Sequence, residues 1–317
     1  MKLVKSTIAV ATCAILAQPA LAANVEIYGR ADVSLQSSDS GEGSFSEINS
    51  NASRIGFKGT HALNENLEVV YQAEFEVDID GDGDVFKARN QFVGLKGALG
   101  EVLLGKNDSM LKQSQGKTDL FSDYNADIKK LWVGENRLSD TVTYKSPKLN
   151  GFQLGATYMA EDEVDGSDAF SVAAFYGDKK LKKSNVYAAL AYDSEVKGQS
   201  KDKAVDKTQF DTIRATVQGK FAGVVLGLML QNQEDVNSGA EMDGMMISAK
   251  YKLGSTTLKG QYQVADHKGG EKNTGITAGV DYKLAKTTKL YAYYTTFDLK
   301  TADSDEDYLA AGIQYKF

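Results

Sequence analysis

Two-residue alternation of apolar and polar side chains recurs along nearly the whole chain. In LEVVYQAEFEVD, residues 67–78, every odd position from Leu67 to Val77 is apolar, and the even positions are polar except Val70. This period predicts an extended strand with one apolar and one charged face. The pattern returns in VEIYGRADVSL (25–35), FQLGATYMAE (152–161), TIRATVQGKF (212–221), TLKGQYQV (257–264) and ITAGVDYKL (276–284). The chain is therefore expected to be all-β.

The connections between these segments are of two kinds, short and long, which alternate along the chain. Short ones such as LNEN (63–66) and LAKTT (284–288) alternate with long polar ones such as SSDSGEGSFSE (37–47) and KTADSDED (300–307). Spacing and pattern together give about 16 strands of roughly 9–14 residues, the length that a tilted strand needs to cross a membrane. Alternating short turns and long loops are typical of an antiparallel membrane barrel.

Two architectures can use amphipathic strands, and the residues on the two faces decide between them. A sandwich buries its apolar faces against each other, whereas a membrane barrel turns them outward to lipid. Here the apolar faces are rich in Ala, Gly and Tyr, and Arg, Lys, Glu and Gln stand at mid-strand on the polar faces. This combination favours a transmembrane barrel with a wet interior.

Residues 1–22 are predicted to be a secretory signal peptide, which leaves residues 23–317 as the barrel. Lys2 and Lys5 precede a short apolar run, and Ala20-Leu21-Ala22 is a small-residue cleavage site. Removing the leader takes two of 36 basic residues, none of 43 acidic ones and the only Cys, so the net charge moves from −7 to −9. The acidic balance argues against nucleic acid as a partner.

Four segments, in order along the chain, resemble the general (diffusion) porins of Gram-negative outer membranes. They are SRIGFKG (53–59), RNQFVGLKGALGEVLLGK (89–106), VTYKSPKLNGFQLGATY (142–158) and the closing GIQYKF (312–317). The resemblance implies a barrel of about 16 strands, with short periplasmic turns, long external loops and the third loop folded into the pore. It implies a homotrimer in the outer membrane that passes ions and small hydrophilic solutes by passive diffusion.

In that family, basic residues of the barrel wall face acidic residues of the third loop. The resemblance implies that the third loop corresponds to residues 107–135 and that its acidic residues lie in TDLFSDYNAD (118–127). The implied pore constriction consists of Arg30, Arg54, Arg89 and Arg137 on the wall and Asp119, Asp123 and Asp127 on the loop. Facing rows of charge set up a transverse field between low-dielectric walls. Because Lys112, Lys117, Lys129 and Lys130 also lie in the loop, the ion preference stays open.

The C-terminal end of the chain is expected to act as a signal for assembly of the barrel in the membrane. YLAAGIQYKF (308–317) places Tyr315 and Phe317 on the apolar face, and the resemblance implies that the barrel-assembly machinery reads this terminal aromatic. The other implied partners are outer-membrane lipid and lipopolysaccharide.

No catalytic, cofactor or metal site is predicted, and the chain is not expected to be an enzyme. DIDGDGDVF (78–86) matches the first half of a calcium loop, but the twelfth position is Arg89, where a bidentate Glu is required. Weak divalent binding by this acidic second loop, or a latch to a neighbouring subunit or lipopolysaccharide, stays an alternative. His61 and His267 show no metal-binding spacing.

Two other functions remain open at this point. A solute-specific channel would add a binding site or an aromatic track inside the lumen. A structural or adhesive barrel would have a plugged pore.

Overall fold

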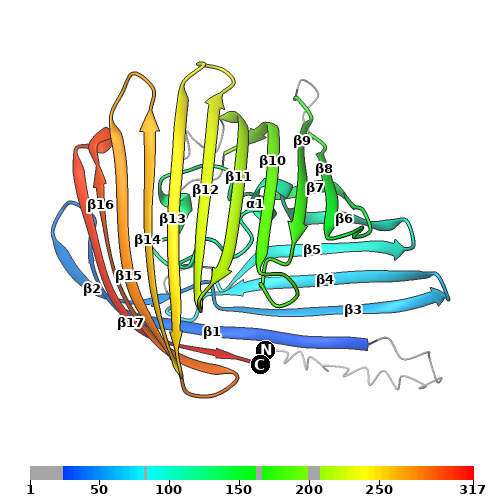
Figure 1. Cartoon of the computed structure of the whole chain (residues 1–317), viewed down its shortest axis with the longest axis horizontal. Helices are drawn as coiled ribbons and strands as arrows, with labels where there is room; N and C mark the ends of the chain where they lie inside the picture. Colours follow the sequence, from blue (N-terminus) through cyan, green and yellow to red (C-terminus); the bar gives the residue numbers. More distant parts are fainter. Residues whose placement is uncertain (1–23, 82–83, 162–165, 199–207) are drawn as a thin grey trace, which may run out of the picture.

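The computed structural model describes residues 24–81, 84–161, 166–198 and 208–317. Its strands pair antiparallel with their neighbours along the chain, and the last strand pairs with the first (Figure 1). The sheet therefore closes on itself, which confirms the predicted barrel. The leader at residues 1–22 lies outside the described residues.

The strands follow one another with few other elements between them. They are β1 (Asn24–Asp39), β2 (Ser44–Ser50), β3 (Arg54–Asn64), β4 (Leu67–Val77), β5 (Phe86–Gly97), β6 (Gly100–Asp108), β7 (Arg137–Lys145), β8 (Phe152–Met159), β9 (Ala169–Gly177), β10 (Val186–Lys197), β11 (Gln209–Phe221), β12 (Val224–Asp235), β13 (Glu241–Leu253), β14 (Thr256–His267), β15 (Lys272–Lys283), β16 (Thr288–Leu299) and β17 (Ser304–Lys316). The short helices are α1 (Met110–Ser114), η1 (Ile128–Lys130) and η3 (Lys300–Ala302).

β2 and β3 are two halves of one wall strand. β2 pairs with β1 from Val33 to Asp39, and β3 pairs with β1 from Asn24 to Arg30. Between them, Ala52 adopts a left-handed conformation with φ of 49°, which interrupts the regular pairing. Counted as one strand, they give a wall of 16 strands, as the alternation predicted.

The two faces of the wall have opposite polarity. On β1, Asp32, Ser34, Gln36 and Ser38 point inward and are almost fully buried, whereas Leu35 points outward and is 61% exposed. On β4, Glu74 is buried on the inner face, and Phe75 lies on the outer face against Phe86, with ring centroids 6.1 Å apart. Exposed apolar residues outside and buried polar residues inside are the arrangement of a barrel surrounded by lipid.

The barrel closes at the C-terminus. Gly29 and Phe317 exchange backbone hydrogen bonds of 3.0 and 3.2 Å, and β17 continues this pairing with β1 from Arg30 onward. A Cβ at position 29 would lie 2.8 Å from the backbone oxygen of Arg54 and 2.3 Å from the ring of Phe317, so the close approach at the seam favours glycine at this position. Within the described residues, no helix is long and apolar enough to cross a membrane.

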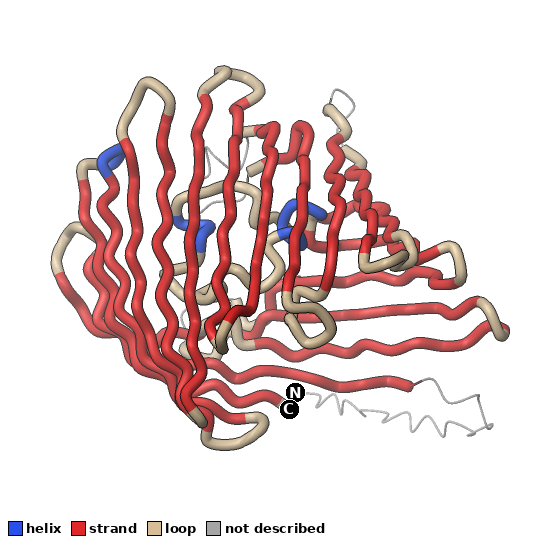
Figure 2. The backbone as a smooth tube through the Cα atoms, viewed as in Figure 1, coloured by secondary structure: helices blue, strands red, loops and turns tan. Residues whose placement is uncertain are grey.

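The segment between β6 and β7, residues 109–136 and here called the inner loop, turns into the barrel (Figure 2). Its apolar side chains pack on the inner faces of the wall. Trp132 and Ile128 contact Met residues of β12 and β13, Phe121 and Tyr124 contact Tyr residues of β16, and Met110 and Leu111 contact Ala residues of β9 and β10. This matches the predicted inward third loop, with bounds shifted by one or two residues from 107–135.

Candidate functional site

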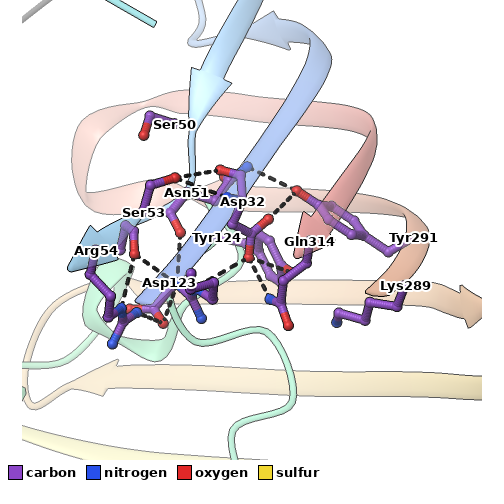
Figure 3. Close-up of polar contacts among 12 residues, drawn as sticks. Asp32, Ser50, Asn51, Ser53, Arg54, Asp123, Tyr124, Lys289, Tyr291 and Gln314 are labelled. Carbon is purple, nitrogen blue, oxygen red and sulfur yellow. Dashed lines mark hydrogen bonds and ion pairs between the residues drawn. The ribbon is translucent and has the colours of Figure 1, made fainter. Parts of the chain in front are cut away.

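One carboxylate of the inner loop meets arginines from two adjacent strands. Asp123 accepts hydrogen bonds from Arg54 of β3 at 2.7 Å and from Arg30 of β1 at 2.9 Å, both to the same Oδ2 atom (Figure 3). Arg30 and Arg54 are register partners across β1 and β3, so alternation places both guanidinium groups on the inner face at the same level. The loop and the wall therefore meet at this point.

The row of charges continues onto the next two strands. On β4, Glu74 and Glu76 each accept a 2.6 Å hydrogen bond from Arg89 of β5, and the guanidinium of Arg54 lies 3.9 Å from Glu74. Glu76 is the register partner of Arg54 across β3 and β4. The interior thus carries a continuous band of alternating charge, in which Asp123 is the contribution of the loop.

The other two predicted loop acids have a different role. Asp119 accepts hydrogen bonds from the backbone N–H groups of Phe121 and Ile128, at 2.8 and 3.1 Å. Asp127 accepts from the backbone of Asp123 at 3.0 Å and of Lys129 at 2.9 Å. Both carboxylates satisfy backbone donors in an irregular buried segment, where unpaired N–H groups are costly. They hold the turn that presents Asp123 and do not contact the arginines themselves.

The pKa values of the loop acids follow these surroundings. Burial by itself would raise the pKa of Asp123, but the charges of Arg54, Arg30 and Arg89 outweigh it and hold the pKa well below its usual range. Burial, followed by the negative charge of Asp127, raises the pKa of Asp119 to about 8. Asp123 is therefore the loop carboxylate that stays charged at neutral pH beside the arginines.

Arg137, the fourth predicted wall residue, lies with other partners. It donates to Asn90 of β5 at 2.7 Å and forms an ion pair with Asp108 of β6 at 3.0 Å. Its pore role stays a prediction.

A second inward-facing carboxylate belongs to Asp32, which lies on β1 two residues from Arg30. It was not singled out in the sequence analysis. It accepts hydrogen bonds from Tyr291 at 2.7 Å and Gln314 at 2.5 Å, so it ties β1 to β16 and β17 (Figure 3). Tyr124 of the inner loop packs against Tyr291 with the two rings tilted by 44° and their centroids 4.9 Å apart. The sequence feature that could have identified Asp32 was its mid-strand position on the polar face of β1.

On the opposite wall, a buried ion pair holds the other end of the inner loop. Glu135 accepts a 2.6 Å hydrogen bond from Arg214 of β11, and both side chains are almost fully buried. Arg214 also donates to Gln231 of β12 at 2.8 Å. Trp132 donates from its ring nitrogen to the carbonyl of Val264, 2.8 Å away. The pattern TIRATVQGKF placed Arg214 on the polar face, but it gave no indication of this partner.

The acidic second loop shows no metal site in the part that the structure describes. Asp80 accepts a hydrogen bond from the backbone of Ser50, at the end of β2. Asp82 and Gly83 of the calcium-like segment lie outside the described residues. Across the described ranges, no group of three or more His, Cys, Asp or Glu residues could hold a metal ion.

The comparisons with known proteins agree with this architecture. The profile of the Gram-negative porin family matches residues 6–315. The chain is 23% identical to a monosaccharide porin from a Halomonas species over 92% of each chain. Among solved structures, an anion-selective porin from Comamonas acidovorans superposes with a TM-score of 0.80, at 21% identity over 93% of this chain and all of that one. The trimer form of OmpT, an outer membrane protein of Vibrio cholerae, superposes with a TM-score of 0.67, at 20% identity over 93% of this chain and all of that one.

Proposed function

Because this chain belongs to the Gram-negative porin family and is a diffusion channel of the outer membrane, we propose that its constriction is lined by the cluster that Asp123 forms with the arginines of β1, β3 and β5. The observation that carries the proposal is the pairing of Asp123 with both Arg30 and Arg54. The inner loop contributes the negative charge of Asp123 to this cluster, and the barrel wall contributes the positive charges of the arginines.

Passage through this gap needs no covalent step, and we assign no catalytic role to any residue. Guanidinium groups stay charged at every relevant pH, and Asp123 stays ionised beside them. Fixed opposite charges lining a narrow gap orient dipolar solutes and hold ordered water, which an apolar solute must displace. The gap therefore favours ions and small hydrophilic solutes, and its width sets the size limit.

Conductance of the purified protein in planar bilayers, combined with a substitution at the constriction, tests this proposal. Replacing Arg54 with Ala removes a bulky charged side chain and one partner of Asp123, so single-channel conductance should rise. Replacing Lys58 with Ala is the matched control, because Lys58 lies on the inner face of the same strand and pairs with Glu26 at 3.0 Å, away from Asp123. An unchanged conductance in the Arg54 variant would place the constriction elsewhere.

Neutral sugars are the second solute class to test. The Halomonas relative is named a monosaccharide porin. Swelling of proteoliposomes in isotonic glucose should proceed at a rate that rises linearly with the sugar gradient. Saturation at millimolar sugar would instead favour a solute-specific channel, and a folded barrel without any conductance would favour the plugged alternative.

We also propose that the protein is a homotrimer, that Tyr315 and Phe317 act as the assembly signal, and that residues 1–22 are removed on export. The trimer form of the Vibrio neighbour supports the first point. For the second, the outward position of both rings, 6.1 Å apart at the end of β17, leaves them accessible to a receptor. Chemical crosslinking, deletion of Phe317 and N-terminal sequencing of the exported protein test the three points separately.

A further inference from the structure

The half of the lumen nearest the short turns carries a set of lysines that the constriction does not use. Lys145 of β7, Lys250 of β13 and Lys316 of β17 each follow inward-facing residues at two-residue spacing, Thr143, Ser248 and Gln314 respectively. Lys179 lies in the turn between β9 and β10. With Lys117 of the inner loop, these residues are here called the lysine vestibule.

Lys117 occupies the central position in the vestibule. Its backbone carbonyl accepts a hydrogen bond from Gln218 at 3.0 Å, and the next carbonyl, that of Thr118, accepts one from Ser248 at 2.6 Å. These bonds fix the backbone against β11 and β13 while the Lys117 side chain stays exposed to the lumen. From this position its charge acts on Lys179, Lys250 and Lys316, which come from three separate parts of the wall.

The positive charge of the vestibule is only partly offset nearby: Glu101 of β6 is the cross-strand register partner of Lys145, but the two side chains form no ion pair. Several other inward lysines on this side have carboxylate partners: Lys58 pairs with Glu26, Lys96 with Glu68, and Lys259 and Lys289 share Asp281. In contrast, none of the five vestibule lysines forms an ion pair within the described ranges. The acids at the constriction are engaged by their own arginines, so a solute leaving the constriction towards the turns enters a region of excess positive charge.

We propose that the lysine vestibule makes this channel prefer anions, and in particular small multivalent anions such as phosphates and polycarboxylates. The inference rests on the proposed diffusion function and adds its substrate class. Charge inside a pore with low-dielectric walls concentrates counter-ions, whereas exposed acids on the outer loops are screened within about 10 Å at 0.1 M salt. The net charge of −7 for the whole chain therefore does not set the preference.

The test is the zero-current potential across a planar bilayer under a potassium chloride gradient. The variant Lys117→Gln/Lys179→Gln/Lys250→Gln removes three vestibule charges. The control Lys268→Gln/Lys272→Gln/Lys300→Gln removes the same number from exposed ion pairs at the loop rim. The native channel should pass chloride better than potassium. In the vestibule variant the chloride-to-potassium permeability ratio should fall about threefold or more, with a larger change at low salt, while the control keeps the native ratio.

A second readout addresses multivalent anions directly. Millimolar citrate should reduce the chloride current of the native channel, and this block should weaken in the vestibule variant. The single variant Lys117→Gln, which loses no ion pair, should change both readouts in the same direction if the triple variant folds poorly. A native channel that prefers potassium, or a vestibule variant that conducts with native selectivity, overturns the inference and leaves the diffusion function standing. A native protein that forms no channel overturns the diffusion function itself.

Discussion

Asp123 accepts a 2.7 Å hydrogen bond from Arg54, and so joins the tip of the inner loop to β3. The same carboxylate oxygen also accepts from Arg30 of β1. One side chain thus supplies the loop's negative charge at the proposed constriction and a polar link between the loop and this part of the wall.

Replacing Asp123 with Asn should shift ion selectivity towards anions. The substitution keeps the size of the side chain and leaves Arg30 and Arg54 without their shared counter-charge, so the constriction becomes more positive. We expect a change in zero-current potential with a nearly native conductance. Asp119→Asn is the control variant, because the Asp119 carboxylate accepts hydrogen bonds from backbone N–H groups of the loop and does not contact the arginines. Equal shifts in the two variants would contradict the separate roles of these acids.

The contribution of Asp123 to ion selectivity should persist at acidic pH. Three arginines hold the pKa of this carboxyl below its ordinary value of 3.8. A carboxyl with a lowered pKa contributes its stabilising charge above the ordinary pKa and loses it only as the pH falls through the lower, folded-state value. The difference in zero-current potential between native channel and Asp123→Asn should therefore be the same at pH 7 and pH 4. A difference that falls by about 40% between pH 7 and pH 4, as expected for a carboxyl with the ordinary pKa of 3.8, would show that Asp123 titrates like an exposed carboxyl.

Replacing Glu135 with Gln should loosen the inner loop without opening the barrel. It leaves the guanidinium of Arg214 buried beside a neutral partner, and breaking such a pair costs about 3–5 kcal/mol. Trp132 is the only Trp of the chain and is 2% exposed. The guanidinium carbon of Arg214 lies over the indole ring, 6.0 Å from the ring centroid. Its fluorescence should therefore shift to the red and become accessible to acrylamide.

Lys130→Met serves as the control for that experiment. It breaks the ion pair of the same loop with Glu306, in which Lys130 is one-third exposed. Pairs in contact with water contribute about 0–1 kcal/mol, so Trp132 should stay protected. Native gel mobility of both variants would show that the barrel remains closed, and an unchanged Trp132 spectrum in Glu135→Gln would refute this anchoring role.

An Arg on the outer face should destabilise the protein according to its depth in the membrane. Leu230 and Leu226 both point outward from β12, Leu230 near the middle of the strand and Leu226 close to its turn. Arg costs about 2–4 kcal/mol at the bilayer midplane and 0–1 kcal/mol near the interface. Leu230→Arg should therefore lower the unfolding free energy in lipid vesicles far more than Leu226→Arg. Equal losses would mean that lipid does not cover this face.

Much of the architecture could be predicted from local patterns. Alternation assigns each side chain of a strand such as β4 to one face, and the charged residues at mid-strand already required a wet interior. The resemblance supplied the inward loop and the arginines. It did not separate Asp123 from Asp119 and Asp127, because their different roles depend on which backbone N–H groups lie within reach after the loop has folded.

The sequence by itself determined which face of each strand is polar, because side chains two residues apart share a face. The residue types on the two faces then favoured a membrane barrel over a sandwich. The tertiary structure alone decided which charges meet. Arg214 pairs with Glu135, and Lys117 lies near Lys250 and Lys316, only because ring closure and loop packing bring distant segments together. Charges act through space, so the electrostatic character of the pore is fixed only when the barrel has closed.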